Sequence, residues 1–118
     1  MEQDEIMRTG IHPRVVEEIC ELARRHGVNR VILFGSRARG DYHRASDIDL
    51  AVCGGNIVEF ALDVEETTST LLCFDVVDLG RPLKEEFLAR IRRDGILRYE
   101  NLRMAEGIQE RYPYAREL

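Results

Sequence analysis

The stretch that decides the fold is residues 34–50, which read FGSRARGDYHRASDIDL. It joins the end of an apolar run, a Gly-Ser pair, a basic loop and a segment with two aspartates. Because side chains alternate along a strand, Asp47 and Asp49 are predicted to project from one face while Ile48 and Leu50 point to a core. Two ionised carboxylates this close together repel each other beside an apolar sheet, and a divalent cation relieves that repulsion. Ligands that are all acidic oxygens favour Mg²⁺, with Mn²⁺ as the alternative.

The Gly-Ser pair predicts a phosphate-binding turn. Gly35 allows the backbone to approach a phosphate closely, and a helix beginning at Ser36 would direct N–H groups and its positive dipole end toward it. Arg37 and Arg39 add positive charge and donors nearby. At 41–42 the chain has Asp-Tyr where a Walker P-loop has Lys-Ser or Lys-Thr, which excludes that motif. A phosphate-binding turn beside a two-carboxylate metal site predicts metal-assisted phosphoryl or nucleotidyl transfer.

Outside this stretch, the apolar pattern predicts alternating helices and strands. This order indicates an α/β fold, with a small mixed β-sheet of about four strands flanked by helices. We expect one domain over residues 1–118, with polar, loosely packed ends at 1–10 and about 111–118. The helix over 57–71 is expected to carry Leu71 on its apolar face. The predicted helices cover residues 13–26, 57–71, 82–93 and 100–110, and the predicted strands cover 30–34, 47–53, 73–79 and 96–99.

Gly35-Ser36, ten intervening residues and Asp47-x-Asp49 resemble the motif of the DNA polymerase β-like nucleotidyltransferases. More narrowly, the chain resembles the minimal nucleotidyltransferases (MNT), which act as antitoxins beside HEPN-domain toxins in prokaryotic toxin–antitoxin pairs. The resemblance extends from the preceding helix through about Tyr99. It implies a polymerase β palm-like fold, ATP as substrate and two Mg²⁺ ions as cofactors.

The predicted third strand offers a further carboxylate for this site. Asp75 and Asp78 are separated by an odd number of positions, so they face opposite sides of a regular strand and only one can join the site. The resemblance favours Asp75, which begins an apolar segment after the long helix, and Asp78 remains the alternative. It implies that Asp47, Asp49 and Asp75 are the catalytic, metal-binding residues. Gly35, Ser36, Arg37 and Arg39 are then the expected nucleotide-binding residues.

Composition limits the other functions of the chain. The formal net charge of −5, from 17 Lys and Arg against 22 Asp and Glu, argues against stable nucleic-acid binding. No apolar run approaches the roughly 20 residues that span a membrane, and the acidic start of the chain lacks a signal-peptide profile. A cytoplasmic protein is therefore expected. The cysteines lie far apart without a Cys-x-x-Cys spacing, so Cys20, Cys53 and Cys73 are expected to be buried free thiols rather than zinc ligands.

The resemblance also implies that the acceptor is a protein. In such pairs the antitoxin transfers AMP from ATP to a tyrosine hydroxyl of the HEPN ribonuclease and silences it, within a homo- or hetero-oligomer. The exposed face of the first helix and the segment from Glu100 are candidate docking surfaces. One alternative is a non-catalytic antitoxin that masks its partner. The other is a small-molecule nucleotidyltransferase that modifies an antibiotic, which requires an acidic pocket from a second domain or a second copy.

Overall fold

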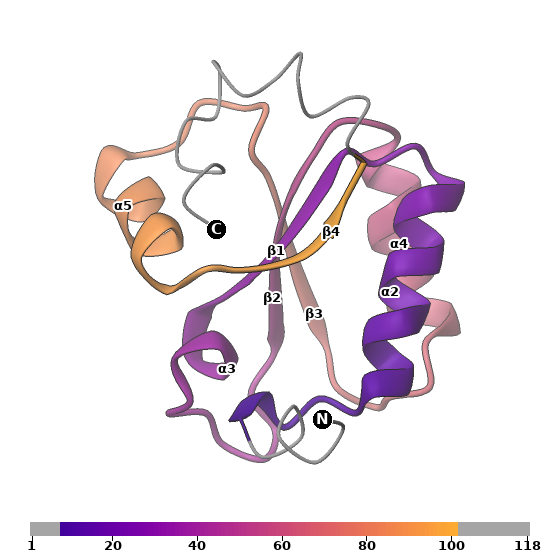
Figure 1. Ribbon diagram of the computed structural model, residues 1–118, viewed down its shortest axis with the longest axis horizontal. Helices are drawn as coiled ribbons and strands as arrows, with labels where there is room; N and C mark the ends of the chain where they lie inside the picture. Colours follow the sequence, from indigo (N-terminus) through magenta and orange to yellow (C-terminus); the bar gives the residue numbers. More distant parts are fainter. Residues whose placement is uncertain (1–7, 102–118) are drawn as a thin grey trace.

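The computed structural model describes residues 8–101, in which four strands form one sheet with helices on both faces (Figure 1). The helices are α2 (Pro13–Arg25), α3 (Gly35–Arg39), α4 (Ile57–Thr67) and α5 (Glu85–Asp94). The strands are β1 (Arg30–Phe34), β2 (Ile48–Cys53), β3 (Phe74–Asp78) and β4 (Ile96–Glu100).

Two predictions at the ends of the chain are wrong where the structure describes them. Glu100, predicted to begin a helix over 100–110, is the last residue of β4, and Thr9, within the segment 1–10 predicted to pack loosely, is buried. The rest of these segments, 1–7 and 102–118, lies outside the described residues.

The sheet is mixed, as the sequence predicted. Its strand order is β3-β2-β1-β4, so β3 and β4 are the edge strands. β1 pairs antiparallel with β2 and with β4, whereas β2 pairs in parallel with β3. A parallel pair requires a crossover connection, and α4 lies in the connection from the end of β2 to the start of β3. This parallel pairing brings the start of β3 next to the start of β2.

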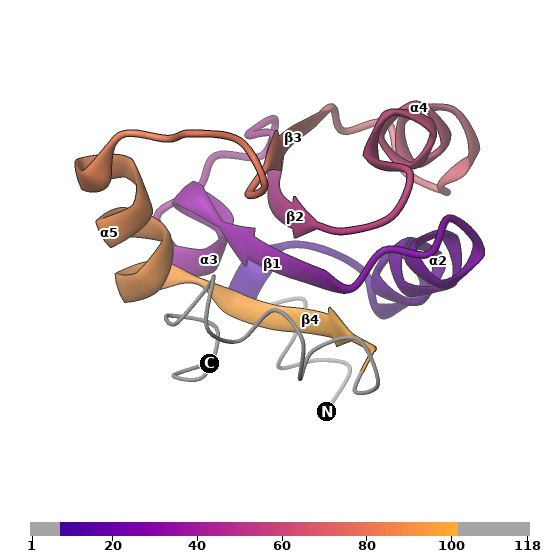
Figure 2. The same ribbon diagram turned by 90° about the horizontal axis from the view of Figure 1, so that it is seen from above.

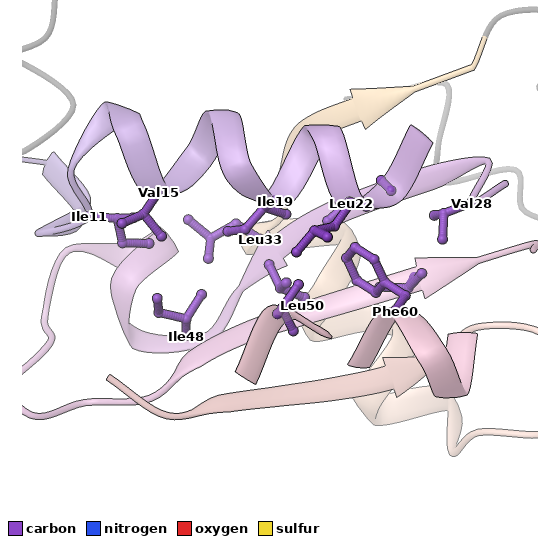
Figure 3. Close-up of a cluster of buried hydrophobic side chains, with 13 residues drawn as sticks. Ile11, Val15, Ile19, Leu22, Val28, Leu33, Ile48, Leu50 and Phe60 are labelled. Atoms are coloured by element: carbon purple, nitrogen blue, oxygen red, sulfur yellow. The ribbon is translucent and has the colours of Figure 1, made fainter. Parts of the chain in front are cut away.

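One face of the sheet is covered by α2 and α4 and the other by α5, and α3 lies at one end of the sheet (Figure 1 and Figure 2). Every residue of β1 is buried, because this central strand contributes side chains to both faces. Figure 3 shows Ile48 and Leu50 of β2 among side chains from α2 and Phe60 of α4. Asp49, which lies between them along β2, must therefore face the α5 side.

The first predicted helix is confirmed with nearly the predicted bounds. Pro13 occupies its first turn, and the His12 Nδ1 atom accepts a hydrogen bond of 3.0 Å from the Arg14 N–H. Gly27, with a φ of 68°, follows the helix end. Its fully exposed positions are all charged, namely Arg14, Glu17, Glu21, Arg24 and Arg25.

Two helix bounds differ from the sequence prediction. α4 ends at Thr67 because the hydroxyls of Thr67 and Thr68 donate to the carbonyls of Asp63 and Val64, and Thr68 then adopts an extended backbone. Leu71, predicted to lie on the apolar face of this helix, is fully exposed instead. α5 begins at Glu85, three residues later than predicted.

The cysteines follow the prediction only in part. Cys53 is buried, and burial raises the pKa of its thiol to about 11. Cys20 is partly buried, but Cys73 is exposed, because it lies in the connection just before β3. Between Arg8 and Asn101, no helix is long and apolar enough to cross a bilayer.

Candidate active site

Asp49 and Asp75 lie side by side at one end of the sheet. They are partners in the register of the parallel pair β2–β3. Ile48 and Leu50 point into the core beneath α2 and α4, so Asp49 faces the α5 side. Phe74 and Val76 pack toward that same core, so Asp75 also faces the α5 side. The fold therefore places two carboxylates from different strands on one face.

The electrostatics of Asp49 record this crowding. Burial, followed by the negative charges of Asp75 and then Asp47, together raise the pKa of Asp49 to about 6. Arg39 and Arg37 oppose the shift without cancelling it. Asp49 therefore lies in a place where added positive charge is strongly favoured.

Asp47 lies one residue before β2 rather than inside the predicted strand, and it is exposed. Its charge still acts on Asp49, which is consistent with side chains two positions apart on the same face. Asp47, Asp49 and Asp75 thus form one electrostatic group, with Asp49 the innermost of the three.

Asp78, the alternative third carboxylate, is held elsewhere. It pairs in register with Val52 at the far end of β2. Its carboxylate accepts hydrogen bonds from the Gly80 N–H at 2.8 Å and from the Arg81 Nε at 3.4 Å. The structure brings Asp75 to Asp49 and keeps Asp78 at the end of β3, where its carboxylate caps the following turn.

Gly35 makes the approach of α3 to β2 possible. Its φ is 76°, and a Cβ built at this position would lie 2.0 Å from the Asp49 Oδ2 atom. The space that a side chain would fill is therefore occupied by the Asp49 carboxylate. Ser36 follows in the first turn of α3 and is partly exposed, so the Gly-Ser turn borders the carboxylate pair directly.

Arg37, expected to bind nucleotide, has a different environment. Its side chain is 1% exposed. The guanidinium donates to the backbone carbonyls of Thr9, His43, Arg44 and Ser46 at 2.8 to 3.4 Å, and it lies 4.7 Å from the centre of the Tyr42 ring. Ser46 immediately precedes Asp47. Arg37 thus holds the loop that leads to Asp47, and its hydrogen-bonding groups face the protein.

Arg39 lies at the border of the site and is available to solvent. Its side chain is 40% exposed and forms ion pairs with Asp41 at 3.2 Å and with Asp94 of α5 at 3.7 Å. Asp94 therefore links α5 to the site. Sequence reasoning missed this residue, because Asp94-Gly95 has the ordinary pattern of a helix end and nothing local connects it to Arg39.

The three aspartates suit a hard divalent cation. The side-chain ligands they offer are all carboxylate oxygens, and Asp49 is surrounded by like charge. Across residues 8–101, no three His, Cys, Asp or Glu side chains are arranged closely enough to enclose a metal ion. Repulsion between ionised carboxylates favours such separation when only protein atoms surround them.

Comparison with known sequences identifies the family. The family described as Polymerase beta, Nucleotidyltransferase matches residues 17–103, which is most of the chain. The chain therefore belongs to the polymerase beta nucleotidyltransferase family, and the family predicted from the motif is confirmed. A putative protein adenylyltransferase of Methanocaldococcus jannaschii is 44% identical over 50 residues, which are 42% of this chain and 48% of that protein. The chain thus spans about half the length of this relative.

Solved structures confirm the fold. One chain of a toxin–antitoxin crystal structure with AMP-PNP aligns with a TM-score of 0.63 and 23% identity, over 86% of both chains. A structure of a tri-AMPylated Shewanella oneidensis HEPN toxin in complex with MNT antitoxin aligns with a TM-score of 0.57 and 19% identity, over 87% of this chain and 84% of that chain. At these identities the likeness establishes the common nucleotidyltransferase fold.

Proposed function

We propose that this chain is a Mg²⁺-dependent nucleotidyltransferase that transfers AMP from ATP to a tyrosine hydroxyl of a HEPN-domain toxin, and so acts as its antitoxin. Family membership and the relative named as a putative protein adenylyltransferase support the reaction. The toxin–antitoxin structures that share the fold support the partner. The observation that carries the proposal is the register of Asp49 with Asp75 directly beside Gly35.

Asp47, Asp49 and Asp75 are the residues proposed to hold Mg²⁺, with Mn²⁺ as the alternative metal. When bound, the metal neutralises the triphosphate and the charge that develops during transfer. Asp49 is fixed most firmly of the three, since it is partly buried between β1 and β3. Asp75 is exposed on the edge strand, so a hydroxyl carried by another protein can reach its carboxylate from outside.

The Gly35–Ser36 turn is proposed to hold the outgoing phosphates. Because the Gly35 backbone lies against the Asp49 carboxylate, phosphates at this turn would lie next to the acidic group. Arg39 is the arginine proposed to contact them, since its side chain is partly exposed at the border of the site. Arg37 is assigned an indirect role, as the residue that holds the loop before Asp47.

The proposed reaction follows from these positions. The acceptor oxygen forms a bond to the α-phosphorus of ATP, the bond between the α-phosphorus and the bridging oxygen breaks, and pyrophosphate leaves. The hydroxyl proton passes to the Asp75 carboxylate, which lies where the acceptor approaches. Orientation of the two reactants by the turn and the edge strand contributes alongside the charge stabilisation.

Label transfer from α-labelled ATP tests the proposal. The purified chain is incubated with Mg²⁺ and its cognate HEPN-domain protein, and an Asp47→Asn/Asp49→Asn double variant serves as the control. We expect label on the partner only with the wild-type chain, together with loss of the partner's ribonuclease activity. A stable complex that silences the ribonuclease without label would instead establish the masking antitoxin. Label on an aminoglycoside but not on protein would establish the small-molecule enzyme.

A further inference from the structure

An apolar groove lies between α4 and the edge strand β3, on the opposite side of the sheet from Asp75. Its volume is about 440 Å³. Figure 2 shows α4 on the β3 side of the helix layer and α2 on the β4 side. The groove is lined by Ile57, Val58, Ala61, Leu62 and Glu65 of α4 and by Phe74 and Val76 of β3.

The groove exposes apolar side chains that a solvated surface normally does not carry together. Val58 is 68% exposed and Leu62 is 52% exposed, and they are one helical turn apart. Leu71 is the other large hydrophobic residue exposed in residues 8–101, and it does not line the groove. Exposed apolar side chains that lie together along a groove are a feature of docking surfaces.

Edge strand β3 leaves one side of its backbone open along this groove. β2 pairs with its inner side, and in the part of the chain that the structure describes no strand pairs with its outer side. At the start of the strand, the Phe74 N–H donates to the Glu65 carboxylate at 2.9 Å, which joins β3 to α4. The groove therefore combines an exposed helix face with a sheet edge.

The charged side chains that α4 exposes are all acidic, namely Glu59, Glu65 and Glu66. Residues 45–80 contain no Lys, Arg or His. Asp63, the other acidic residue of α4, binds His26. Two copies meeting symmetrically through this face would bring like charges together, which disfavours a second copy as the occupant. A cationic partner is favoured instead.

We infer that the α4–β3 groove is the docking site for the protein that carries the acceptor hydroxyl, and that this partner presents an apolar segment flanked by Lys and Arg. The inference rests on the proposed function and adds the surface and chemistry of recognition. Phe74 and Val76, which line the groove, flank Asp75 on the same strand. A partner held in the groove is therefore held at the edge where the Asp75 carboxylate is accessible.

Binding of the cognate HEPN-domain protein to chain variants tests this inference. A Val58→Ser/Leu62→Ser double variant removes the apolar anchors, and Leu71→Ser is the matched control because it removes an exposed leucine outside the groove. We expect the double variant to raise the Kd by at least about tenfold and Leu71→Ser to leave it unchanged, as measured by titration calorimetry. Glu66→Lys should weaken binding and reduce its salt dependence. Unchanged circular dichroism and unchanged binding of a fluorescent ATP analogue verify the fold and the nucleotide site.

The outcomes separate docking from catalysis. Loss of binding in the double variant supports the groove even when the wild-type chain transfers no label, in which case only the proposed reaction fails. Label transfer by the double variant with an unchanged KM overturns the groove and leaves the reaction intact. Absence of any complex with the wild-type chain overturns the inference. Sedimentation showing that the double variant loses self-association, with partner binding unchanged, would assign the groove to a second copy.

Discussion

Carboxylates at the two ends of the central strand β1 have opposite charge environments. At its last residue, Phe34 pairs with Asp49, whose pKa is raised by burial and by two other aspartates. At its first residue, Arg30 is buried and binds the Glu100 carboxylate, with its Nε atom at 2.8 Å. At the Arg30 end, a cation of the protein itself neutralises the carboxylate. At the Phe34 end, the aspartates are left with excess negative charge. Uncompensated charge in a well-packed sheet indicates a place that is built for a ligand.

The largest expected effect comes from removing the Asp49 carboxylate at the Phe34 end of β1. Asp49→Asn should reduce AMP transfer by on the order of 10³-fold, because it removes the innermost carboxylate of the proposed metal site. The melting temperature of the apo protein should stay equal or rise. Single-turnover label transfer with saturating ATP measures the first quantity, and thermal unfolding measures the second. Gross unfolding of the variant would show that Asp49 has a structural role instead.

A substitution at the Arg30 end of β1 should lower stability and leave activity nearly unchanged. Arg30→Met should lower the free energy of unfolding by about 3 kcal/mol, because it leaves the Glu100 carboxylate without its cation. At a temperature where the variant is folded, kcat should be near that of the wild type. Urea unfolding of Arg30→Met and of the Arg30→Met/Glu100→Leu double variant tests the reason. Recovery of stability in the double variant is expected, and an equally unstable double variant would contradict the ion-pair explanation.

Gly35→Ala should disturb the site with a smaller effect on stability. The added methyl group cannot occupy the 2.0 Å gap to the Asp49 Oδ2 atom, and the positive φ strains any L side chain. We expect a loss of about 2 kcal/mol in unfolding free energy and weaker ATP binding. Gly27→Ala is the matched control, since Gly27 also has a positive φ but its Cβ would meet nothing within 4 Å. Equal ATP binding by the two variants would argue against the contact with Asp49.

The smallest expected effect is a pH dependence of stability. The folded protein raises the pKa of Asp49 from 3.8 to about 6, so ionisation of Asp49 destabilises the fold. Below about pH 4 this cost is absent, and above about pH 6 to 7 it is complete, at about 1 to 2 kcal/mol after solvent screening. Asp49→Asn should therefore be more stable than wild type at neutral pH and equal to it near pH 4.

Adding Mg²⁺ provides a second test of the charge at Asp49 by thermal unfolding. At neutral pH the cation should raise the melting temperature of the wild-type chain and leave that of Asp49→Asn unchanged. A stability difference between the two proteins that does not vary with pH would show that Asp49 is not the group responsible.

Local sequence chemistry predicted the strands and the family motif because both depend on neighbouring residues. The alternation of Asp47 to Leu50 fixed which side chains enter the core, and the structure confirms Ile48 and Leu50 there. The choice between Asp75 and Asp78 depended on the parallel register with β2, which is set by pairing across the crossover helix α4. No pattern within the third strand contains that information.

Arg37 shows a second limit of the sequence. Arg37 was predicted to bind phosphate because its positive charge follows the Gly-Ser turn, and arginine is rarely buried. Its burial depends on carbonyl groups from the 43–46 loop and from Thr9, which is 28 positions away in the chain. The groove could be predicted in part from the sequence of α4. Val58 and Leu62 are apolar residues on the side of this helix opposite the core residues Phe60 and Val64.

The edge position of β3 has a consequence for how the protein moves. Within residues 8–101, β1 has strand neighbours on both sides and every residue buried, whereas β3 has one strand neighbour and no fully buried residue. Local opening costs least where buried contacts are fewest, so β3 amides should exchange with deuterium faster than those of β1. Opening of β3 separates Asp75 from Asp49 while β1 and β2 stay paired. A protein bound along this edge would slow that opening, so the arrival of the acceptor would itself keep the third carboxylate in place.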